Sequence, residues 1–360
     1  MSWNSARRYE AAVAIDRAQQ ESRQSGIVMR WLRGLMIGGL ALMLIALATL
    51  VVSSKLSVDS DRHHTAKARS LAPLSTATPR GLIQIPARGF AFRARVAGLD
   101  GEGPALLALH GFPESSIMWQ PLMDAAESEG FRVVAFDQRG YSPLARPDSV
   151  DAYRLPELVA DVFAVADAVG FERFHLVGHD WGAIVGWVAA GQDHERVLSF
   201  GSLSIPHPGA IRLGNEGQDT PLYVKVFRMP GVVETLFTAR DLGLMRNGLY
   251  ASMPEAQIDE YVSIFSEPGA LRAALNCYRA MPDRFIAAEN LADEVEQPVL
   301  YVVGTRDLPV FTRQAVRDLQ PRFATGPYQE VELDAGHWLI QEQPEKVVEA
   351  IMKHLRGLSL

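Results

Sequence analysis

The chain has 360 residues, of which 48% are hydrophobic and 21% are charged, and its formal net charge is −7. This composition is that of a globular protein and excludes a mostly disordered chain. The negative net charge gives no general attraction to nucleic acid, so a nucleic-acid partner is not expected. Cys277 is the only cysteine, which excludes an intrachain disulfide and a metal site built on clustered cysteines. The sequence predicts neither a metal nor another cofactor.

An uncharged apolar run from Gly34 to Val52 is the most unusual segment of the sequence. As a helix, its roughly 19 residues extend about 28 Å, close to the hydrocarbon thickness of a bilayer. A buried core helix is usually apolar on one face only, and the preceding arm is too long for a typical signal peptide. The run predicts a transmembrane anchor at 34–54 in contact with membrane lipid, between an N-terminal arm (1–33) and a linker (55–80). Basic residues flank the span equally, so the distribution of charge does not indicate its orientation. Because the arm before the span is short and the domain after it is large, we expect a single-pass membrane protein whose catalytic domain is exported.

Short β-rich runs alternate with longer helical stretches from about Gly81 onward. Near-continuous apolar runs of strand length indicate parallel strands buried on both faces, and 155–170 has helical periodicity. The predicted strands are 105–110, 131–137, 174–178, 196–204 and 298–304. A long segment separates the predicted strands 196–204 and 298–304, and its apolar residues recur with helical periodicity. We therefore expect a doubly wound, mostly parallel α/β sheet in 81–206 and 286–360, with 207–285 inserted as a helical cap over the strand ends.

The segment Gly178-His179-Asp180-Trp181-Gly182 lies between a predicted strand and a predicted helix. Glycines at both ends allow the chain to turn sharply from strand into helix, which presents the central side chain at the rim of the sheet. An aspartate at this point could also be an ordinary helix cap, since the helix dipole stabilises a carboxylate there. The glycine-flanked turn has a steric purpose, however, only if something must approach the central side chain. We therefore predict that Asp180 is a catalytic nucleophile.

Three motifs follow one another along the chain: HGFP at 110–113, DQRGYS at 137–142 and GHDWG at 178–182. Together they resemble the epoxide hydrolase branch of the α/β-hydrolase superfamily, and the similarity extends from about residue 81 to the C-terminus. The resemblance implies an α/β-hydrolase fold with a helical cap, and an enzyme that opens epoxides. It also implies a cis peptide bond before Pro113.

The base and the acid of such a site should follow the nucleophile, with the acid between the nucleophile and the base. His337 stands on a small-residue loop after the strand-like run 328–334, and Asp307 follows the predicted strand 298–304. Asp334 is a competing acid, but its closeness to His337 in sequence makes it a better turn residue. We predict that His337 is the catalytic base and that Asp307 orients it.

The backbone N–H groups of Phe112 and Trp181 are predicted to form an oxyanion hole. Trp181 directly follows the nucleophile, and Phe112 lies in the HGFP loop, which are the two usual sources of such donors. His110 and Pro113 are expected to shape this loop and, with Trp181, to line the substrate pocket. Trp338, next to the predicted base, is expected in the same pocket wall.

Two tyrosines of the predicted cap bear on the nature of the electrophile. An epoxide oxygen leaves as an alkoxide and needs a proton, which a phenol can donate. Tyr223, in YVKVFRMPG, resembles the first lid motif of epoxide hydrolases, and Tyr278, in LNCYR, resembles the second. The resemblance implies that both hold and protonate the epoxide oxygen. The second motif usually has tryptophan where this chain has Cys277, which we expect to reshape the pocket wall.

The predicted reaction is hydrolysis of a small lipophilic epoxide to a vicinal diol, with water as the second substrate. Asp180 forms an alkyl ester, and water activated by His337 hydrolyses that ester. A haloalkane or haloacid dehalogenase is an alternative, but its halide site usually adds an asparagine or a second tryptophan. Phe112 and a cap without tryptophan do not fit that pattern. A non-catalytic, membrane-bound binding protein on the same scaffold is a further alternative, although it would usually have lost a catalytic position.

Overall fold

The structure is a computed structural model that describes residues 71–75, 78–281 and 294–358. The predicted arm (1–33), the predicted span (34–54) and most of the predicted linker lie outside the described residues. Within the described part of the chain, no helix is long and apolar enough to cross a membrane. The predicted localisation, a single-pass membrane protein with an exported catalytic domain, is therefore corrected, and we no longer assign the protein to a membrane.

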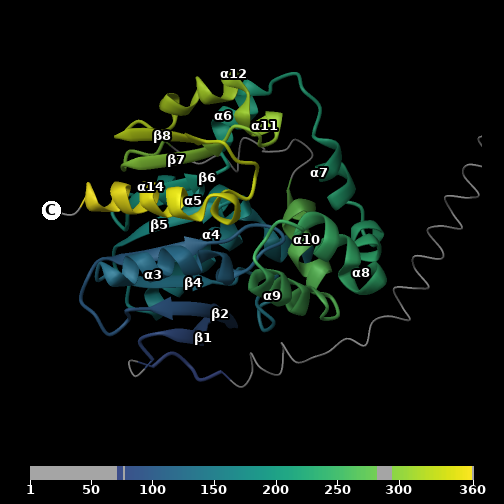
Figure 1. Ribbon diagram of the computed structural model, residues 1–360, viewed down its shortest axis with the longest axis horizontal. Helices are drawn as coiled ribbons and strands as arrows, with labels where there is room; N and C mark the ends of the chain where they lie inside the picture. Colours follow the sequence, from purple (N-terminus) through teal and green to yellow (C-terminus); the bar gives the residue numbers. More distant parts are fainter. Residues whose placement is uncertain (1–70, 76–77, 282–293, 359–360) are drawn as a thin grey trace, which may run out of the picture. The chain divides into compact units, whose positions relative to one another are not determined.

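The described residues form an eight-stranded sheet with the order β1-β2-β4-β3-β5-β6-β7-β8 (Figure 1). β1 (Gly81–Ala87) and β2 (Phe90–Ala97) form an antiparallel hairpin, and β2 also pairs antiparallel with β4. All other neighbours in the sheet are parallel. The remaining strands are β3 (Ala105–Leu109), β4 (Arg132–Phe136), β5 (Phe174–His179), β6 (Val197–Leu203), β7 (Val299–Gly304) and β8 (Tyr328–Leu333). The predicted mostly parallel sheet is confirmed, and the antiparallel hairpin was not predicted.

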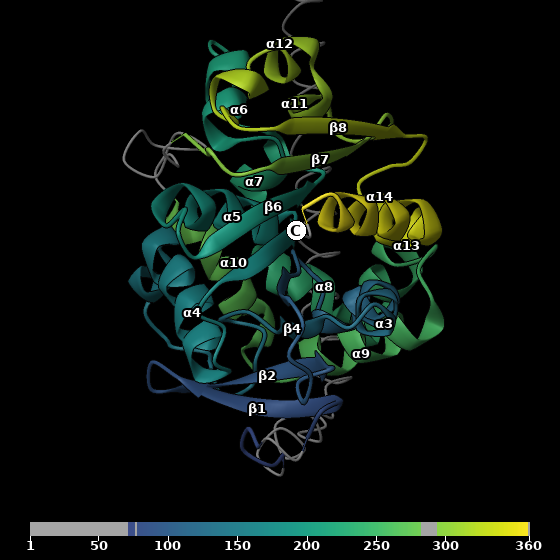
Figure 2. The same cartoon turned by 90° about the vertical axis from the view of Figure 1, so that its left-hand side faces the viewer.

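Helices cover both faces of the sheet, which explains why its central strands are apolar throughout. Successive side chains of a strand point to opposite faces. In β3, Leu107 and Leu109 belong to one hydrophobic cluster, whereas Leu106 and Ala108 belong to the other. Figure 2 shows the helices of the two faces on opposite sides of the strands: α3 (Gln120–Ser128) and α14 (Pro344–Arg356) on one side, α4 (Leu155–Ala168) and α5 (Trp181–Gln192) on the other.

The strand order brings the predicted site residues to one edge of the sheet. His110 directly follows β3, Asp180 follows β5, Asp307 lies in the loop after β7, and His337 lies in the loop after β8. These four strands are parallel to one another, so their carboxyl ends meet at the same edge, where ligands bind in open α/β sheets.

A helical insertion separates β6 from β7. Figure 1 shows most of its helices together, to the right of the strands. Its helices are α6 (Pro208–Gly214), α7 (Leu222–Phe227), α8 (Val232–Leu244), α9 (Glu255–Phe265) and α10 (Ala270–Ala280), with a π-helical turn at Met245–Leu249. The segments after β7 and β8 carry the short helices α11 (Pro309–Thr312), α12 (Gln314–Arg317) and α13 (Leu339–Glu342). Turns of 3₁₀ helix lie at Ser116–Trp119, Val150–Tyr153 and Gln320–Arg322.

Glu260 of α9 connects the insertion to the sheet through a largely buried cluster of charges. Its carboxylate accepts hydrogen bonds from Arg95 (2.9 Å) and from the Ser115 hydroxyl (2.5 Å), and it pairs with Arg93 at 3.0 Å. Arg93 also pairs with Asp137. Burial alone would raise the pKa of Glu260, but the charges of Arg93 and Arg95 outweigh it and hold that pKa below its usual value. The cluster therefore keeps Glu260 ionised between two cations.

Replacing Glu260 tests how strongly this cluster holds the insertion. Glu260→Gln leaves both arginines short of a negative charge in a buried place, so we expect the free energy of unfolding to fall by about 3 kcal/mol. Urea unfolding of the full-length protein measures the change. Glu255→Gln, at an exposed position of the same helix, is the matched control and should stay within about 0.5 kcal/mol of wild type. Equal, small changes in both variants would show that the cluster contributes little.

Candidate active site

Asp180 sits in a strained turn that only glycine neighbours allow. Its φ of 48° and ψ of −118° place a non-glycine residue at positive φ directly before α5. A Cβ on Gly178 would lie 2.3 Å from the carbonyl oxygen of Gly182, and a Cβ on Gly182 would lie 2.1 Å from that of Leu109. A Cβ on Gly111 would lie 2.4 Å from the Cβ of Asp180. The three glycines therefore permit the close approach of strand, helix and loop that presents this carboxylate.

The two oxygens of the Asp180 carboxylate have different partners. The Phe112 N–H donates to Oδ1 at 2.8 Å, and His337 Nε2 lies 3.5 Å from Oδ2. Burial raises the pKa of Asp180, but the hydrogen bond and charge of His337 outweigh it and lower that pKa below its usual value. Of the two predicted oxyanion donors, Phe112 contacts the carboxylate; no hydrogen bond from the Trp181 N–H to Asp180 is present among the described residues.

His337 lies between two carboxylates. Its Nδ1 is 3.0 Å from Asp307 Oδ2 and 3.1 Å from Oδ1, while Nε2 faces Asp180. Burial lowers the pKa of His337, but the negative charges and hydrogen bonds of Asp307 and Asp180 raise it to about 10. Asp334, the competing acid, is exposed and pairs with Arg306 at 2.9 Å. The structure thus brings Asp180, His337 and Asp307 together and leaves Asp334 out.

A polar network that the sequence did not predict holds the backbone of His337. The His337 carbonyl accepts hydrogen bonds from His179 Nε2 and from the Ser204 hydroxyl, both at 2.9 Å. His179 Nδ1 lies 2.8 Å from Glu114, which also accepts from Gln341 at 2.6 Å. The contacts of His179 were not predicted from the sequence. The sequence did offer a signal: Glu114 directly follows the HGFP motif, and His179 directly precedes Asp180.

Both predicted lid tyrosines lie close enough to Asp180 for its charge to act on them. The Tyr278 ring, on α10, is 5.0 Å from the Trp181 ring, and Phe227 contacts the rings of Tyr278 and Tyr223 at 5.1 and 5.7 Å. Burial is the main cause that raises the pKa of both phenols, and the negative charge of Asp180 raises it further. Both side chains are therefore protonated at neutral pH and are available as donors.

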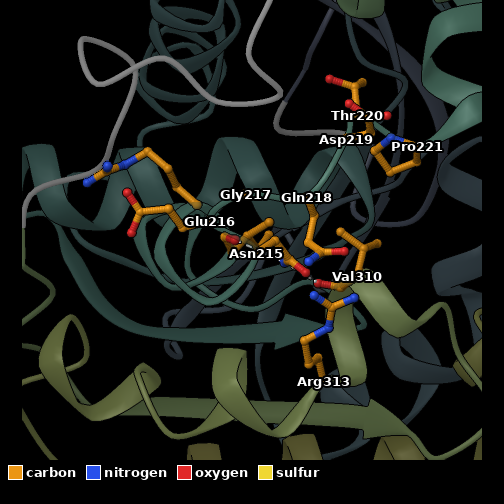
Figure 3. Close-up of a pocket in the computed structure, with 11 residues that line it drawn as sticks. Asn215, Glu216, Gly217, Gln218, Asp219, Thr220, Pro221, Val310 and Arg313 are labelled. Carbon is orange, nitrogen blue, oxygen red and sulfur yellow. Dashed lines mark hydrogen bonds between the residues drawn. The ribbon is translucent and has the colours of Figure 1, made fainter.

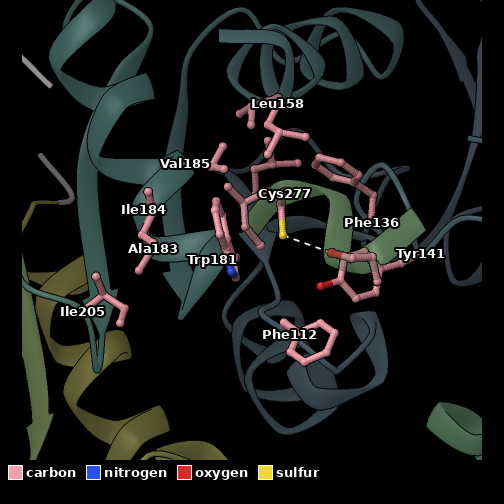
Figure 4. Packing of buried hydrophobic residues seen from close by; sticks show 14 of the residues in the cluster. Phe112, Phe136, Tyr141, Leu158, Trp181, Ala183, Ile184, Val185, Ile205 and Cys277 are labelled. Carbon is pink, nitrogen blue, oxygen red and sulfur yellow. Dashed lines mark hydrogen bonds between the residues drawn. The ribbon is translucent and has the colours of Figure 1, made fainter. Parts of the chain in front are cut away.

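Cys277 lies in an aromatic wall of the same region. Figure 4 shows its side chain between Trp181 and Tyr141, with Phe112 facing it. The thiol is buried and donates to the Ala274 carbonyl at 3.0 Å. The Tyr141 hydroxyl is also buried and has no hydrogen-bond partner among the described residues. A small side chain therefore stands beside several large rings in the wall near Asp180.

The HGFP loop is held from both sides. His110 is fully buried, and its ring nitrogens face the Gly111 carbonyl (2.9 Å) and the Gln138 N–H (3.0 Å). Its polar atoms are therefore not free to contact a substrate. The peptide bond before Pro113 is cis, and the Pro113 carbonyl accepts from the Tyr250 hydroxyl at 2.5 Å. This contact, which was not predicted from the sequence, connects the insertion to the loop.

Trp338 contacts the candidate base, and a pocket lies farther away. Trp338 is half-buried, and its ring lies 5.1 Å from that of His337. A separate pocket of about 620 Å³ lies beside α11, and Val310 of that helix lines it (Figure 3). The next residue of α11, Phe311, has its ring 6.1 Å from the His337 ring. None of the predicted site residues lines that pocket. Within the described ranges, no group of three or more His, Cys, Asp and Glu side chains is arranged to hold a metal ion.

Comparison with known proteins agrees with this geometry. Residues 106–350 match the Alpha/beta hydrolase family. Epoxide hydrolase A of Mycobacterium tuberculosis is 31% identical over 317 residues, which cover 77% of this chain and 97% of that protein. The crystal structure of epoxide hydrolase A from Mycobacterium thermoresistibile is 29% identical with a TM-score of 0.67, covering 78% of this chain and 99% of the other. An epoxide hydrolase structure from Vigna radiata is 27% identical with a TM-score of 0.66, covering 79% and 100%. The chain therefore belongs to the α/β-hydrolase family, in its epoxide hydrolase branch.

Proposed function

We propose that this protein hydrolyses an epoxide to a vicinal diol, with Asp180 as nucleophile and His337 as base. The observation that carries the proposal is the pairing of the Asp180 carboxylate, with Oδ1 bound by the Phe112 N–H and Oδ2 opposite His337. A carboxylate is suited to attack an sp³ carbon, giving an alkyl ester that water can hydrolyse. The relatives that are named epoxide hydrolases support an epoxide as the electrophile.

In the first step, Oδ2 of Asp180 attacks an epoxide carbon while Tyr223 and Tyr278 hold and protonate the oxygen. The lowered pKa of Asp180 keeps the nucleophile ionised, and the raised pKa of each tyrosine keeps its proton in place until the C–O bond breaks. Aromatic rings that include Phe227 and Trp181 surround the tyrosines. These rings favour a small lipophilic epoxide as the substrate.

In the second step, the change of charge at Asp180 prepares the base. Ester formation removes the negative charge on Asp180, which is one of the causes that raise the pKa of His337. His337 then loses its proton more readily and can take a proton from the attacking water, while Asp307 still accepts from Nδ1. The Phe112 N–H stabilises the oxyanion that develops on Oδ1, and we propose the Trp181 N–H as the second donor.

We assign the helical insertion, 207–285, the role of a cap on a hydrolase core formed by 81–206 and 286–360. The insertion carries both tyrosines, so it completes the site for the first step. Tyr250 and Glu260 bind it to the HGFP loop and to the segment after it, through Pro113 and Ser115. Cap and nucleophile are therefore connected through one loop.

Trapping the ester separates the two steps. His337→Gln removes the base and leaves the nucleophile, so we expect the covalent ester to accumulate when this variant is mixed with styrene oxide. Intact-mass spectrometry of the quenched protein detects the adduct. Asp180→Asn is the matched control and should carry none. Turnover by the wild type without any adduct on His337→Gln would contradict a covalent route.

The tyrosines are tested by removing their hydroxyls. Because a general acid typically contributes about 10²–10⁴ in rate, Tyr223→Phe combined with Tyr278→Phe should slow epoxide opening by at least about 10². Tyr328→Phe, at the amino end of β8 and so at the edge of the sheet opposite the site, is the control and should keep the wild-type rate in the same stopped-flow assay. If the double variant opens epoxides normally, the tyrosines do not protonate the oxygen. Faster release of halide from short haloalkanes than opening of epoxides would favour the dehalogenase alternative.

A further inference from the structure

The hydrogen bonds of His110 define its protonation state. Nε2 lies 3.0 Å from the backbone N–H of Gln138, and a backbone N–H can only donate, so Nε2 must be the unprotonated acceptor. Nδ1 lies 2.9 Å from the Gly111 carbonyl oxygen, which can only accept. A single neutral tautomer, with the proton on Nδ1, satisfies both contacts. Burial lowers the pKa of His110, which keeps the ring neutral.

Gln138 also fixes where the ring stands. Its side-chain amide donates to the His110 carbonyl at 2.5 Å, while its backbone N–H donates to the ring. Gln138 lies after β4 and His110 lies after the neighbouring strand β3. The histidine is thus held at its backbone and at its ring by one residue from the adjacent strand.

The carbonyl that His110 binds belongs to the same peptide unit as the N–H that binds the nucleophile. The Gly111 carbonyl and the Phe112 N–H share one planar trans peptide, so they point in opposite directions. A hydrogen bond that fixes the carbonyl therefore fixes the direction of the N–H, which donates to Asp180 Oδ1 at 2.8 Å. We propose that His110 is a positioning residue that aims the oxyanion-hole amide of Phe112 at Asp180.

This inference rests on the proposed function, and it predicts that the Phe112 N–H accelerates the second step but not the first. During ester formation, the negative charge on the Asp180 carboxylate decreases, so the Phe112 N–H gains nothing in the transition state. During ester hydrolysis, negative charge returns to Oδ1, and the aligned N–H stabilises it. Loss of the alignment should therefore slow the second step and spare the first. The ester should then accumulate in an otherwise intact enzyme.

Two substitutions at His110 differ in where they place an amide donor. The amide nitrogen of asparagine reaches about as far as Nδ1, whereas that of glutamine reaches about as far as Nε2. Since removal of one oxyanion donor costs about 10²–10³ in rate, we expect His110→Gln to slow ester hydrolysis at least tenfold with ester formation unchanged. His110→Asn should recover part of the loss. Rapid quench of the full-length protein with styrene oxide, followed by intact-mass spectrometry, measures both steps.

A purely structural role would slow both steps in parallel, and equal behaviour of the glutamine and asparagine variants would also overturn the proposal. Absence of ester even in His337→Gln would instead overturn the proposed function, so the two failures are distinguishable. The tautomer is tested without turnover, by long-range ¹H–¹⁵N NMR of the histidine rings in the wild-type protein. We expect His110 with the proton on Nδ1 at neutral pH. A proton on Nε2, or on both nitrogens, would contradict the inference even if the variants do not fold.

Discussion

The hydrogen bond from the Phe112 N–H to Asp180 depends on the backbone geometry of two segments, the turn after β5 and the loop after β3. On one side, the turn after β5 forces Asp180 to positive φ so that its carboxylate points out of the strand–helix junction. On the other, Gly111 leaves room for the loop after β3 to approach that carboxylate. Because β3 and β5 are neighbours in the sheet, the register of two strands sets this distance. Two neighbouring strands in the middle of the sheet therefore place the candidate nucleophile.

Charge balance provides the second constraint. One histidine faces two carboxylates, and each carboxylate raises its pKa. In the proposed mechanism, a covalent bond to Asp180 neutralises one of them and leaves Asp307 in place, so the first step would change the pKa of His337 before the second. The backbone of His337 does not have to move for this change, since His179 and Ser204 both hold its carbonyl.

Features set by local sequence or by a recognised motif could be predicted, whereas polar contacts outside those motifs could not. The central strands were predicted from apolar runs. The candidate acid and base were predicted from the chain order usual for such sites and from their places after predicted strands. The hairpin of β1 and β2 was missed because it contains charged residues such as Arg93 and Arg95, which pair with Glu260 of the insertion. No periodicity relates residues so far apart in sequence.

The position of an element relative to the site was also beyond the reach of pattern analysis. His110 was expected in the pocket wall, but the contacts of its ring with Gly111 and Gln138 were not predicted, nor was the hydrogen bond from Tyr250 to Pro113. The type of a residue does not reveal which atoms its neighbours occupy. The apolar run from Gly34 to Val52 led to the prediction of a membrane anchor at 34–54. That segment lies outside the described residues, among which no helix is long and apolar enough to cross a membrane.

A single turnover in heavy-oxygen water tests the covalent role of Asp180 most directly. With enzyme in excess over epoxide, the attacking oxygen comes from the Asp180 carboxylate, and the water oxygen enters that carboxylate when the ester is hydrolysed. The account predicts that the diol from this first turnover carries no heavy oxygen and that a peptide containing Asp180 gains it. Heavy oxygen in the first diol, with an unlabelled Asp180 peptide, would mean that water opens the epoxide directly and would contradict the account.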